Sequence, residues 1–458
     1  MSESLHSNAN YENPAADPRK MRKIIAEDPE WTLATIPLLS ELSIDHIIKG
    51  FAENPILNDL PDSHKKKLID KLSTDVPIHI TANLVTDDAY WKRCCKSKWK
   101  VCDVSEYGKN WRRMYFEKQL EESIEGFTPG MSSMTVVDTF LKLAGKYIYR
   151  MIIRELLPPV RELPKDGSDN DSDGGSDIIE DIEYTSHFDF NLIADKLPNL
   201  EEFYVTYGVR NINMNFDFQM FLFTSVDCMK LGKFIQSSKK IRKFGITRSN
   251  VDDKKSRLLI KYLLNHPNLE SIDFSYNIIG DRGARAFGKI VNCCSYLTSL
   301  NLLDNRISSE GAAAIAHALS RNSTLRFLNL RLNKLRNEGA QSICQALLEN
   351  NTLEEINLAA NEITEQSASY LAKVIATNAT LSVIDISCNK IGADGGKQIQ
   401  EAMESNETIT KFELKLTDCG QESEYCINRI IDSNLRNKSQ HIEDRLLATP
   451  NPVIVRRY

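Results

Sequence analysis

Apolar residues recur with a fixed period through the C-terminal half of the chain. In each copy an apolar residue is followed three and five positions later by two more, and an asparagine closes the pattern. The asparagines of the five regular copies are Asn277, Asn305, Asn333, Asn361 and Asn389, each 28 residues after the last. Apolar residues two apart lie on one face of a strand, so each copy predicts a short strand. The asparagine follows at a turn, where its amide can pair with backbone groups that lack partners, and we expect these five residues to form a structural ladder.

The rest of each copy has the apolar spacing of a helix, as in Ala312, Ile315 and Leu319. A strand and a helix alternating with this period predict an α/β leucine-rich-repeat solenoid. A parallel sheet would line the inside of a horseshoe and helices would cover its outside, and the long repeat resembles the ribonuclease-inhibitor type. Flanking copies have Ser249 and Thr417 in place of asparagine, as is typical of terminal repeats. Leu200, Phe203 and Val205 fit an eighth strand.

The remainder of the chain predicts further parts. Residues 21–160 have short helical patterns separated by prolines, which favours a small, mainly α-helical domain. Residues 161–183 hold nine acidic and two basic side chains, a net charge of −7 (9 − 2), and predict a solvated linker. We expect the repeat domain to span residues 184–436. Residues 1–20 are expected to form a disordered tail, and residues 437–458 a C-terminal tail.

A basic, aromatic stretch marks the centre of the N-terminal domain. Residues 91–118 contain three tryptophans and nine Lys or Arg against three Asp or Glu, a net charge of +6 (9 − 3). The aromatic residues are typical of a core from which long basic side chains reach the solvent. The charges fit an acidic partner surface equally with simple solvation. Candidate partner contacts in this stretch are Lys92, Arg93, Arg112 and Arg113.

The second candidate surface is the concave face of the predicted sheet. Strand residues that alternate with the core positions point to this face, where they would be open to a partner. The candidates there are Asp273, Phe327, Arg331, Glu355, Asp385 and Lys411. Both charge signs and one aromatic residue suit a partner, although a solvated sheet has the same composition.

Composition and motifs narrow the possible chemistry. The net charge of −6 over 458 residues does not indicate nucleic acid, and no apolar run reaches the ~18–20 residues of a membrane span. The polar N-terminus lacks the order of a signal peptide, so the ten cysteines are expected to be reduced thiols. Cys94, Cys95 and Cys102 do not match a zinc pattern, and GADGGKQ (392–398) is not a phosphate loop. We therefore expect no catalytic residue, cofactor or metal, and interpret the protein as non-enzymatic.

Short segments in both predicted domains carry a more specific signal. They are MRKIIAEDPEW (21–31), NPIL (54–57), ANL (82–84), YWKRCC (90–95), WRRMYFE (111–117), LPPV (157–160), TRSNVDDKK (247–255), GDRGAR (280–285), GGKQ (395–398) and QESEY (421–425). In this order they resemble the dynein regulatory complex subunit 5 family, also called t-complex-associated testis-expressed protein 1. The N-terminal segments belong to no general repeat consensus.

The resemblance implies a scaffold subunit of the nexin link between doublet microtubules in the axoneme of cilia and sperm flagella. There the complex regulates dynein-driven motility, in the cytoskeletal part of the cytoplasm. Its implied partners are other subunits of the complex, including coiled-coil subunits, and doublet microtubule or dynein components, without nucleic acid or membrane. The family has no known catalytic residues to carry over.

Two alternatives come from other classes of protein. The tryptophan-rich stretch is similar to the one after the adaptor-binding helices of F-box and elongin A proteins, which would make the chain a substrate receptor of a ubiquitin ligase. A GTPase activator of the repeat type found in the Ran activator would use a concave arginine, for which Arg331 is the candidate. Binding of the small adaptor proteins tests the first alternative, and GTP hydrolysis tests the second.

Overall fold

The computed structural model describes residues 22–24, 34–36, 38–158, 187–210, 212 and 218–448. Contacts divide the chain into two compact units, Met1–Phe116 and Glu117–Tyr458. The expected N-terminal tail at residues 1–20, the acidic linker at 161–183 and the last ten residues lie outside the described residues.

The N-terminal unit consists mainly of short helices. A small antiparallel pair of strands, β1 and β2, precedes them. The elements are β1 (Arg22–Ile24), β2 (Ala34–Ile36), α1 (Leu39–Lys49), α2 (Asp62–Lys71), α3 (Ile78–Leu84), α4 (Asp88–Lys98) and the start of α5 (Trp111–Glu125). Pro61 and Pro77 stand directly before α2 and α3. A proline is tolerated there because the N–H groups at the start of a helix have no partner within the helix. Asp87 caps α4, because its carboxylate accepts from the amides of Ala89 and Tyr90.

The second unit is a solenoid with one nine-stranded parallel sheet. Its strands lie in sequence order: β3 (Arg150–Ile153), β4 (Glu202–Val205), β5 (Lys243–Ile246), β6 (Ser271–Asp273), β7 (Ser299–Asn301), β8 (Phe327–Asn329), β9 (Glu355–Asn357), β10 (Val383–Asp385) and β11 (Lys411–Glu413). Equivalent repeat positions pair in register, as Leu300 does with Leu328. β4 lies where the eighth strand was expected.

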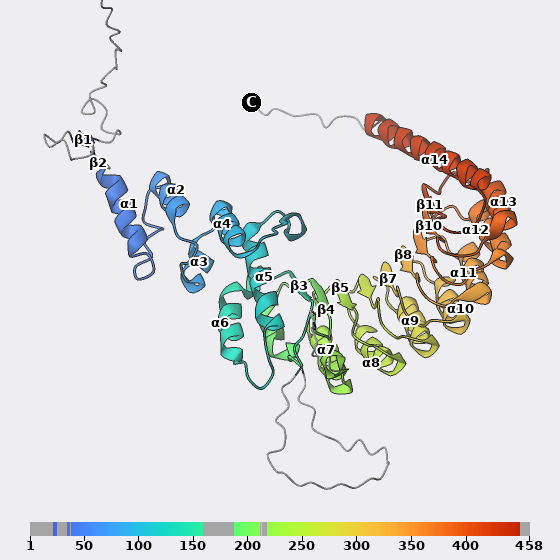
Figure 1. The fold of residues 1–458 in the computed structure, drawn as a ribbon, viewed down its shortest axis with the longest axis horizontal. Coiled ribbons are helices and arrows are strands. Elements are labelled where there is room, and N and C mark those ends of the chain that lie inside the picture. The colour runs from blue at the N-terminus through green and yellow to red at the C-terminus, as the bar shows by residue number, and fades with distance from the viewer. Residues whose placement is uncertain are drawn as a thin grey trace, which may run out of the picture. The chain divides into compact units, whose positions relative to one another are not determined.

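Helices cover the outer side of this sheet (Figure 1). They are α7 (Ser225–Ser237), α8 (Asp253–Leu263), α9 (Asp281–Cys293), α10 (Ser309–Leu319), α11 (Arg336–Glu349), α12 (Ala368–Thr377) and α13 (Gly392–Met403). The same unit also contains α6 (Met134–Ala144) and α14 (Gln421–Ala448). The middle residue of each short strand is buried, as are the helix residues that face it. The expected α/β repeat solenoid, with its parallel sheet inside and helices outside, is confirmed.

The period asparagines form a continuous hydrogen-bond ladder. Asn333 Nδ2 donates to the carbonyl of Leu302 in the preceding repeat at 2.9 Å and to that of Leu330 in its own repeat at 3.0 Å. Its Oδ1 accepts from the amide of Ile307 at 3.1 Å. Asn361 donates to the same Leu330 carbonyl at 2.9 Å, so successive rungs share an acceptor. Each asparagine therefore joins two repeats and satisfies buried backbone groups at the turn.

A second asparagine ladder runs on the other side of the core, where helices lead into the next strand, and its last member lies within α14. Its members are Asn322, Asn350, Asn378, Asn406 and Asn434, again 28 residues apart. Asn378 Nδ2 donates to the carbonyls of Leu347 and Asn350, and its Oδ1 accepts from the amides of Thr380 and Leu381. We did not predict this ladder, although its period is visible in the sequence.

The N-terminal edge of the sheet is covered by glutamates from α5. Tyr149 and Arg150 donate their amides to Glu117 Oε1 at 2.7 and 2.9 Å, and Ile152 donates to Glu121 Oε1 at 2.8 Å. Arg154 likewise donates to Glu125 Oε1 at 2.7 Å. Helix residues four apart are spaced by about 6 Å and strand residues two apart by about 6.6 Å, so the carboxylates match the unpaired amides of β3. They occupy an edge that would otherwise be open to another strand.

Because β3 belongs to the sheet, the boundary between the two units differs from the one expected at residue 160. Sequence patterns placed residues 21–160 in one helical domain, with no clear sheet. In the structure β3 pairs with β4, and the division between the units falls after Phe116. The strand Arg150–Ile153 is short and has no copy of the asparagine frame, which is why its pattern was missed.

At the other end, α14 closes the array. Ile427 and Ile431 are buried, and Asn434 donates to the carbonyls of Asn406 and Ile409 as the last rung of the second ladder. The helix continues to Ala448 through residues that we expected to be tail. Residues 435–440 are exposed.

Candidate partner-binding surfaces

The concave face of the second unit is built from two rows of strand residues. The first residue of each three-residue strand and the third point away from the core, while the residue between them is buried. In the register of the sheet Ser299 neighbours Phe327, which neighbours Glu355. The sequence-predicted candidates on this face therefore lie on one continuous surface, with Arg331 just beyond the end of β8.

The third residue of each strand holds the turn that follows it. Asp273 Oδ1 accepts from the amide of Ser275 at 2.9 Å, and Asp385 Oδ1 accepts from that of Ser387 at 3.0 Å. The second oxygen of each aspartate accepts from an asparagine on the adjoining strand, from Asn301 at 3.0 Å and from Asn357 at 2.8 Å. Asp273 and Asp385 are half-buried, so these two candidates stabilise the sheet before any partner arrives.

The other candidates on this face have fewer interactions within the sheet. Phe327 is half-buried, whereas Glu355 and Arg331 are exposed. Lys411 pairs with Glu413 at 3.7 Å, and Lys415 pairs with the same carboxylate at 3.1 Å. The candidates whose side chains form no ion pair or hydrogen bond within the described sheet are therefore Phe327, Arg331 and Glu355, which we call the concave cluster. Phe327 and Glu355 occupy paired positions on β8 and β9, and Arg331 lies four residues further along the chain from Phe327. Aromatic residues and arginines are enriched among the anchors of protein interfaces.

Left-handed backbone conformation shapes the rim after the strands. At the residue before the ladder asparagine φ is +58° in Tyr276 and +57° in Leu332, although neither is glycine. The same conformation recurs at Asp304, Ala360 and Cys388. These amides still bond to the next repeat, as Leu332 does to the carbonyl of Ala359 at 2.9 Å. The ladder therefore holds each turn in a conformation that costs about 1–2 kcal/mol for an L-residue.

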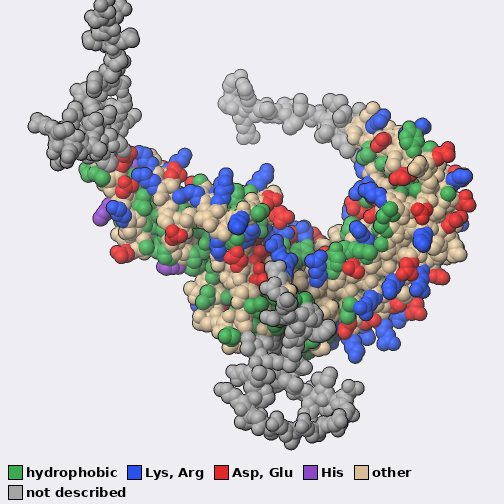
Figure 2. Space-filling view, in the orientation of Figure 1, with side chains coloured by type: hydrophobic (Ala, Val, Ile, Leu, Met, Phe, Trp, Pro, Cys, Tyr) green, Lys and Arg blue, Asp and Glu red, His purple; other side chains and the backbone are tan. Residues whose placement is uncertain are grey.

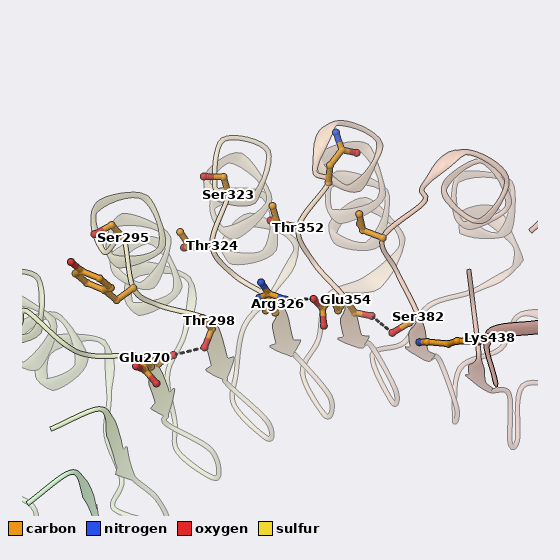
Figure 3. Close-up of a pocket in the computed structure, with 13 residues that line it drawn as sticks. Glu270, Ser295, Thr298, Ser323, Thr324, Arg326, Thr352, Glu354, Ser382 and Lys438 are labelled. Atoms are coloured by element: carbon orange, nitrogen blue, oxygen red, sulfur yellow. Dashed lines mark hydrogen bonds and ion pairs between the residues drawn. The ribbon is translucent and has the colours of Figure 1, made fainter. Parts of the chain in front are cut away.

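A polar groove of about 750 Å³ lies along the opposite rim, where the chain enters the strands (Figure 3). Thr298 Oγ1 donates to the backbone carbonyl of Glu270 at 3.1 Å, and Ser382 Oγ donates to that of Glu354 at 3.2 Å. Arg326 forms an ion pair with Glu354, and Lys438 reaches the groove from α14. Because most of these hydroxyl groups and charges already have partners, the groove is a polar surface rather than an acid–base site.

Some basic side chains of residues 91–118 in the first unit stabilise the fold, and others are exposed. Arg93 Nη1 donates to the carbonyl of Leu72 at 2.9 Å and Nη2 donates to that of Ile69, both at the C-terminal end of α2. Arg112 Nη2 donates to the carbonyl of Ala82 in the last turn of α3. The final carbonyls of a helix have no partner within the helix, so these half-buried guanidinium groups cap α2 and α3.

The other basic side chains lie further out. Lys92 is exposed, with its Nζ 5.5 Å from the ring centre of Trp111. Arg113 is half-buried, while the lysines 96, 98, 100 and 109 are exposed. Trp91 is buried and donates its Nε1 hydrogen to the carbonyl of Val85 at 2.8 Å. The aromatic residues therefore build the core of this segment, and the lysines provide its outward charge.

One buried acid–base pair serves a structural purpose. His187 Nδ1 and Asp227 Oδ2 are 3.0 Å apart, and Thr224 Oγ1 donates to the same oxygen at 2.7 Å in the capping box of α7. Burial would raise the pKa of Asp227, but hydrogen bonds and charge from His187 and hydrogen bonds from Thr224 together hold that pKa below its usual value. Both side chains are almost inaccessible, so a substrate does not reach them.

Buried thiols are likewise unreactive. Burial raises the pKa of Cys344 to about 12 and that of Cys294 to about 11, so both stay protonated near neutral pH. Within the described residues no group of three or more His, Cys, Asp or Glu is placed to hold a metal ion. None of the helices in that part of the chain is long and apolar enough to cross a bilayer.

A family model agrees with the repeat pattern. The Leucine Rich repeat family model matches residues 265–288, 293–316, 321–344 and 377–399. A solved structure of "Leiomodin-1 Actin-Binding Site 2 (ABS2)" matches at 18% identity and a TM-score of 0.29, covering 31% of this chain and 82% of that one.

Curated relatives support the resemblance that the short segments indicated. The chain is 44% identical over 271 residues to Dynein regulatory complex subunit 5 of Mus musculus, covering 59% of this chain and 54% of the relative. It is 26% identical over 221 residues to the protein of the same name from Chlamydomonas reinhardtii, covering 48% of this chain and 50% of the relative. The chain thus spans about half the length of the curated relatives it matches. The predicted resemblance to this family is confirmed.

Proposed function

We propose that this chain is a non-catalytic scaffold subunit of the axonemal nexin–dynein regulatory complex, where it helps to regulate dynein-driven motility of cilia and flagella. The observation that carries this proposal is the similarity to Dynein regulatory complex subunit 5 of mouse and of Chlamydomonas reinhardtii. A repeat solenoid suits such a role, because it offers an extended face to a partner without a catalytic pocket. The repeat family and the relatives favour a structural or regulatory protein over an enzyme.

Within that role we propose the concave cluster as one attachment surface. Phe327 supplies apolar area, while Arg331 and Glu355 form no ion pair with any residue that the structure describes, so both can pair with a partner. The partner would be another subunit of the complex, for which coiled-coil subunits are candidates. Asp273, Asp385 and Lys411 would border the contact rather than dominate it, since each already has a partner within the sheet.

The outward lysines of residues 91–118 are proposed as a second attachment surface, for an acidic partner such as a doublet microtubule component. Of the four residues that the sequence singled out, Lys92 is the one that is exposed. Arg93 and Arg112 cap helices, so their reversal to glutamate would disturb the fold as well as the surface. Lys92→Glu together with Lys96→Glu and Lys100→Glu tests the surface alone.

The decisive experiment is incorporation into axonemes that lack the native subunit, with flagellar waveform as the second readout. The wild-type chain is expected to incorporate and restore beating. Phe327→Ala, Arg331→Glu and Glu355→Lys together leave the net charge unchanged and should reduce incorporation about tenfold or more if the concave cluster is the attachment surface. A matched control, Tyr370→Ala with Arg321→Glu and Glu349→Lys, removes one aromatic ring and reverses one charge of each sign on or beside the outer helices, and it should incorporate normally.

Two results would contradict these proposals. Failure of the folded wild-type chain to incorporate, together with capture of the small adaptor proteins of ubiquitin ligases, would favour the substrate-receptor alternative. Normal incorporation of the concave triple variant would leave the complex as the site of action but move the attachment surface elsewhere.

A further inference from the structure

The outer surface of α8 and α9 carries six exposed cations in a repeated arrangement. They are Lys254, Arg257 and Lys261 on α8 and Arg282, Arg285 and Lys289 on α9. Members of each set are three and then four residues apart, which places them on one face of their helix. The second set follows the first by 28 residues, and the two helices pack side by side. The six cations therefore form two adjacent rows, which we call the basic outer face.

Figure 2 shows blue side chains gathered along the outer edge of the solenoid where Figure 1 labels α8 and α9. The two helices contain seven Lys or Arg and two Asp. Both aspartates serve the neighbouring repeat: Asp253 Oδ1 accepts from the amides of Gly280 and Gly283, and Asp281 Oδ1 accepts from those of Ser308 and Gly311.

Those aspartates do not neutralise the surface. They are half-buried, Oδ1 of each accepts from backbone amides of the next repeat, and Asp281 Oδ2 accepts from the Ser308 hydroxyl. None of the six cations forms an ion pair with a residue in the part of the chain that the structure describes. A repeated, unpaired set of like charges repels itself, so the folded chain gains no stability from it. Its charge is available to a partner of opposite sign.

The surface has defined borders. At the equivalent positions α10 has Glu310, Ala313 and His317, so the charge ends there. On the other side the equivalent positions of α7 are Val226 and Met229, which are 44% and 39% exposed, and the exposed Lys233. Both rows of three cations are therefore confined to α8 and α9, and α7 adds the single cation Lys233 beside two partly exposed apolar residues.

We propose that this face docks an acidic helical segment of a partner protein. Residues seven apart on a helix span about 10 Å, and packed helices lie about 8–10 Å apart, so the six cations match carboxylates on successive turns of one helix. An apolar residue at one end of that segment would contact Val226 and Met229. The face has no exposed aromatic residue between its cations on which nucleic-acid bases would stack. The inference does not depend on the concave cluster.

The test uses the full chain and a fluorescein-labelled synthetic helical peptide, with Glu at positions spaced three and four apart and one terminal Leu. Binding is followed by fluorescence anisotropy at about 50 and 200 mM salt. The wild type should bind more weakly at the higher salt, because exposed charges are screened. The variant with Arg257→Glu, Arg285→Glu and Lys289→Glu should lose about tenfold or more in affinity.

The matched control has Arg321→Glu, Lys390→Glu and Lys397→Glu, an equal change in charge at other exposed positions, and should stay within about twofold of the wild type. Circular dichroism melting establishes that both triple variants are folded. If the glutamate variant does not fold, Arg257→Gln with Arg285→Gln and Lys289→Gln should still weaken binding severalfold.

Several results would overturn the proposal. They are an equal loss in the control, absence of peptide binding by the wild type, and tighter binding of duplex DNA or of anionic phosphatidylserine vesicles through the same residues. The concave triple variant should bind the peptide like the wild type, so this test and the test of the proposed function fail separately.

Discussion

The basic stretch of the N-terminal unit and the basic outer face of α8 and α9 look alike as charge clusters but differ in what their cations do. In the first, Arg93 and Arg112 are half-buried and donate to carbonyls at the ends of α2 and α3. In the second, Arg257 and Arg285 are exposed. A count of charges along the chain does not separate the two. What separates them is whether a helix end with unpaired carbonyls lies within reach of the guanidinium group.

The polar side chains of the repeat unit also divide into those that are hydrogen-bonded within the fold and those that are exposed. Asn333 in the ladder has its polar atoms hydrogen-bonded between two repeats, whereas Asp385 on the concave face holds its own turn and one neighbouring side chain. The exposed side chain of Glu355 forms no hydrogen bond or ion pair with any residue that the structure describes. We therefore expect side chains that hydrogen-bond to backbone groups to contribute to the stability of the fold, and the exposed side chains to contribute to partner binding.

The largest effect is expected at the ladder. Asn333→Leu keeps the approximate size of the side chain but leaves the buried amide of Ile307 without an acceptor, and it removes donors from two carbonyls. We expect the repeat unit to lose about 2–4 kcal/mol, measured by urea unfolding. Thr417→Val at the end of the array removes one hydrogen bond, to the carbonyl of Leu414, and should cost about 1 kcal/mol. Equal losses at the two sites would show that the central rungs are not special.

A smaller loss is expected when a capping cation is removed. Arg112→Met retains most of the apolar contact with Trp91 and Phe116 but leaves the carbonyl of Ala82 without its guanidinium donor. The N-terminal unit should lose about 1–3 kcal/mol, read from amide hydrogen exchange in α3. Lys92→Met in the same stretch should change it by less than about 0.5 kcal/mol. If Lys92→Met is as harmful as Arg112→Met, the distinction between capping and surface cations is wrong.

The glutamates that cover β3 predict a pH dependence. Burial raises the pKa of Glu121 from 4.5 to about 8, with the nearby charges of Glu117 and Glu125 adding to the effect. Because the folded state holds this proton more tightly, its stabilising contribution is complete below about pH 4.5 and is lost as the pH rises towards 8. The slope is at most about 1.4 kcal/mol per pH unit for one proton.

Glu121→Gln tests this directly, since its amide oxygen can still accept from Ile152. The variant should show a flatter fall in stability between about pH 5 and 8 and should exceed the wild type at pH 8. Glu349→Gln, at an exposed position on α11, should leave the wild-type slope in place. Parallel pH profiles for the wild type and Glu121→Gln would mean that Glu121 is ionised in the fold.

The smallest effect on stability is expected at the basic outer face. Arg257→Glu, Arg285→Glu and Lys289→Glu together should change the free energy of unfolding by less than about 0.5 kcal/mol per site, because the replaced side chains are exposed and unpaired within the described chain. Thermal melting of the same protein used for peptide binding provides the measurement. A large loss of stability would place these cations with Arg112 rather than with Lys92.

Much of the repeat unit could be read from the sequence because its contacts lie one period apart. Leu300 pairs with Leu328 and Asn333 reaches Leu302, so a pattern of 28 residues specifies strand, helix, register and ladder together. The same period contained the second ladder and the rows of the outer face. The family resemblance could also be recognised from the sequence, because it depends on short local segments.

Only the tertiary structure decided the features whose contacts have no period. Glu117 accepts from Tyr149, Arg112 donates to Ala82, and β3 pairs with β4, which lies outside the regular 28-residue spacing. Asp385 was expected to face a partner, but its two oxygens are taken up by its own turn and by Asn357. A side chain's chemistry is set by the backbone groups that the fold brings within about 3 Å of it, and local sequence does not specify those neighbours unless they recur.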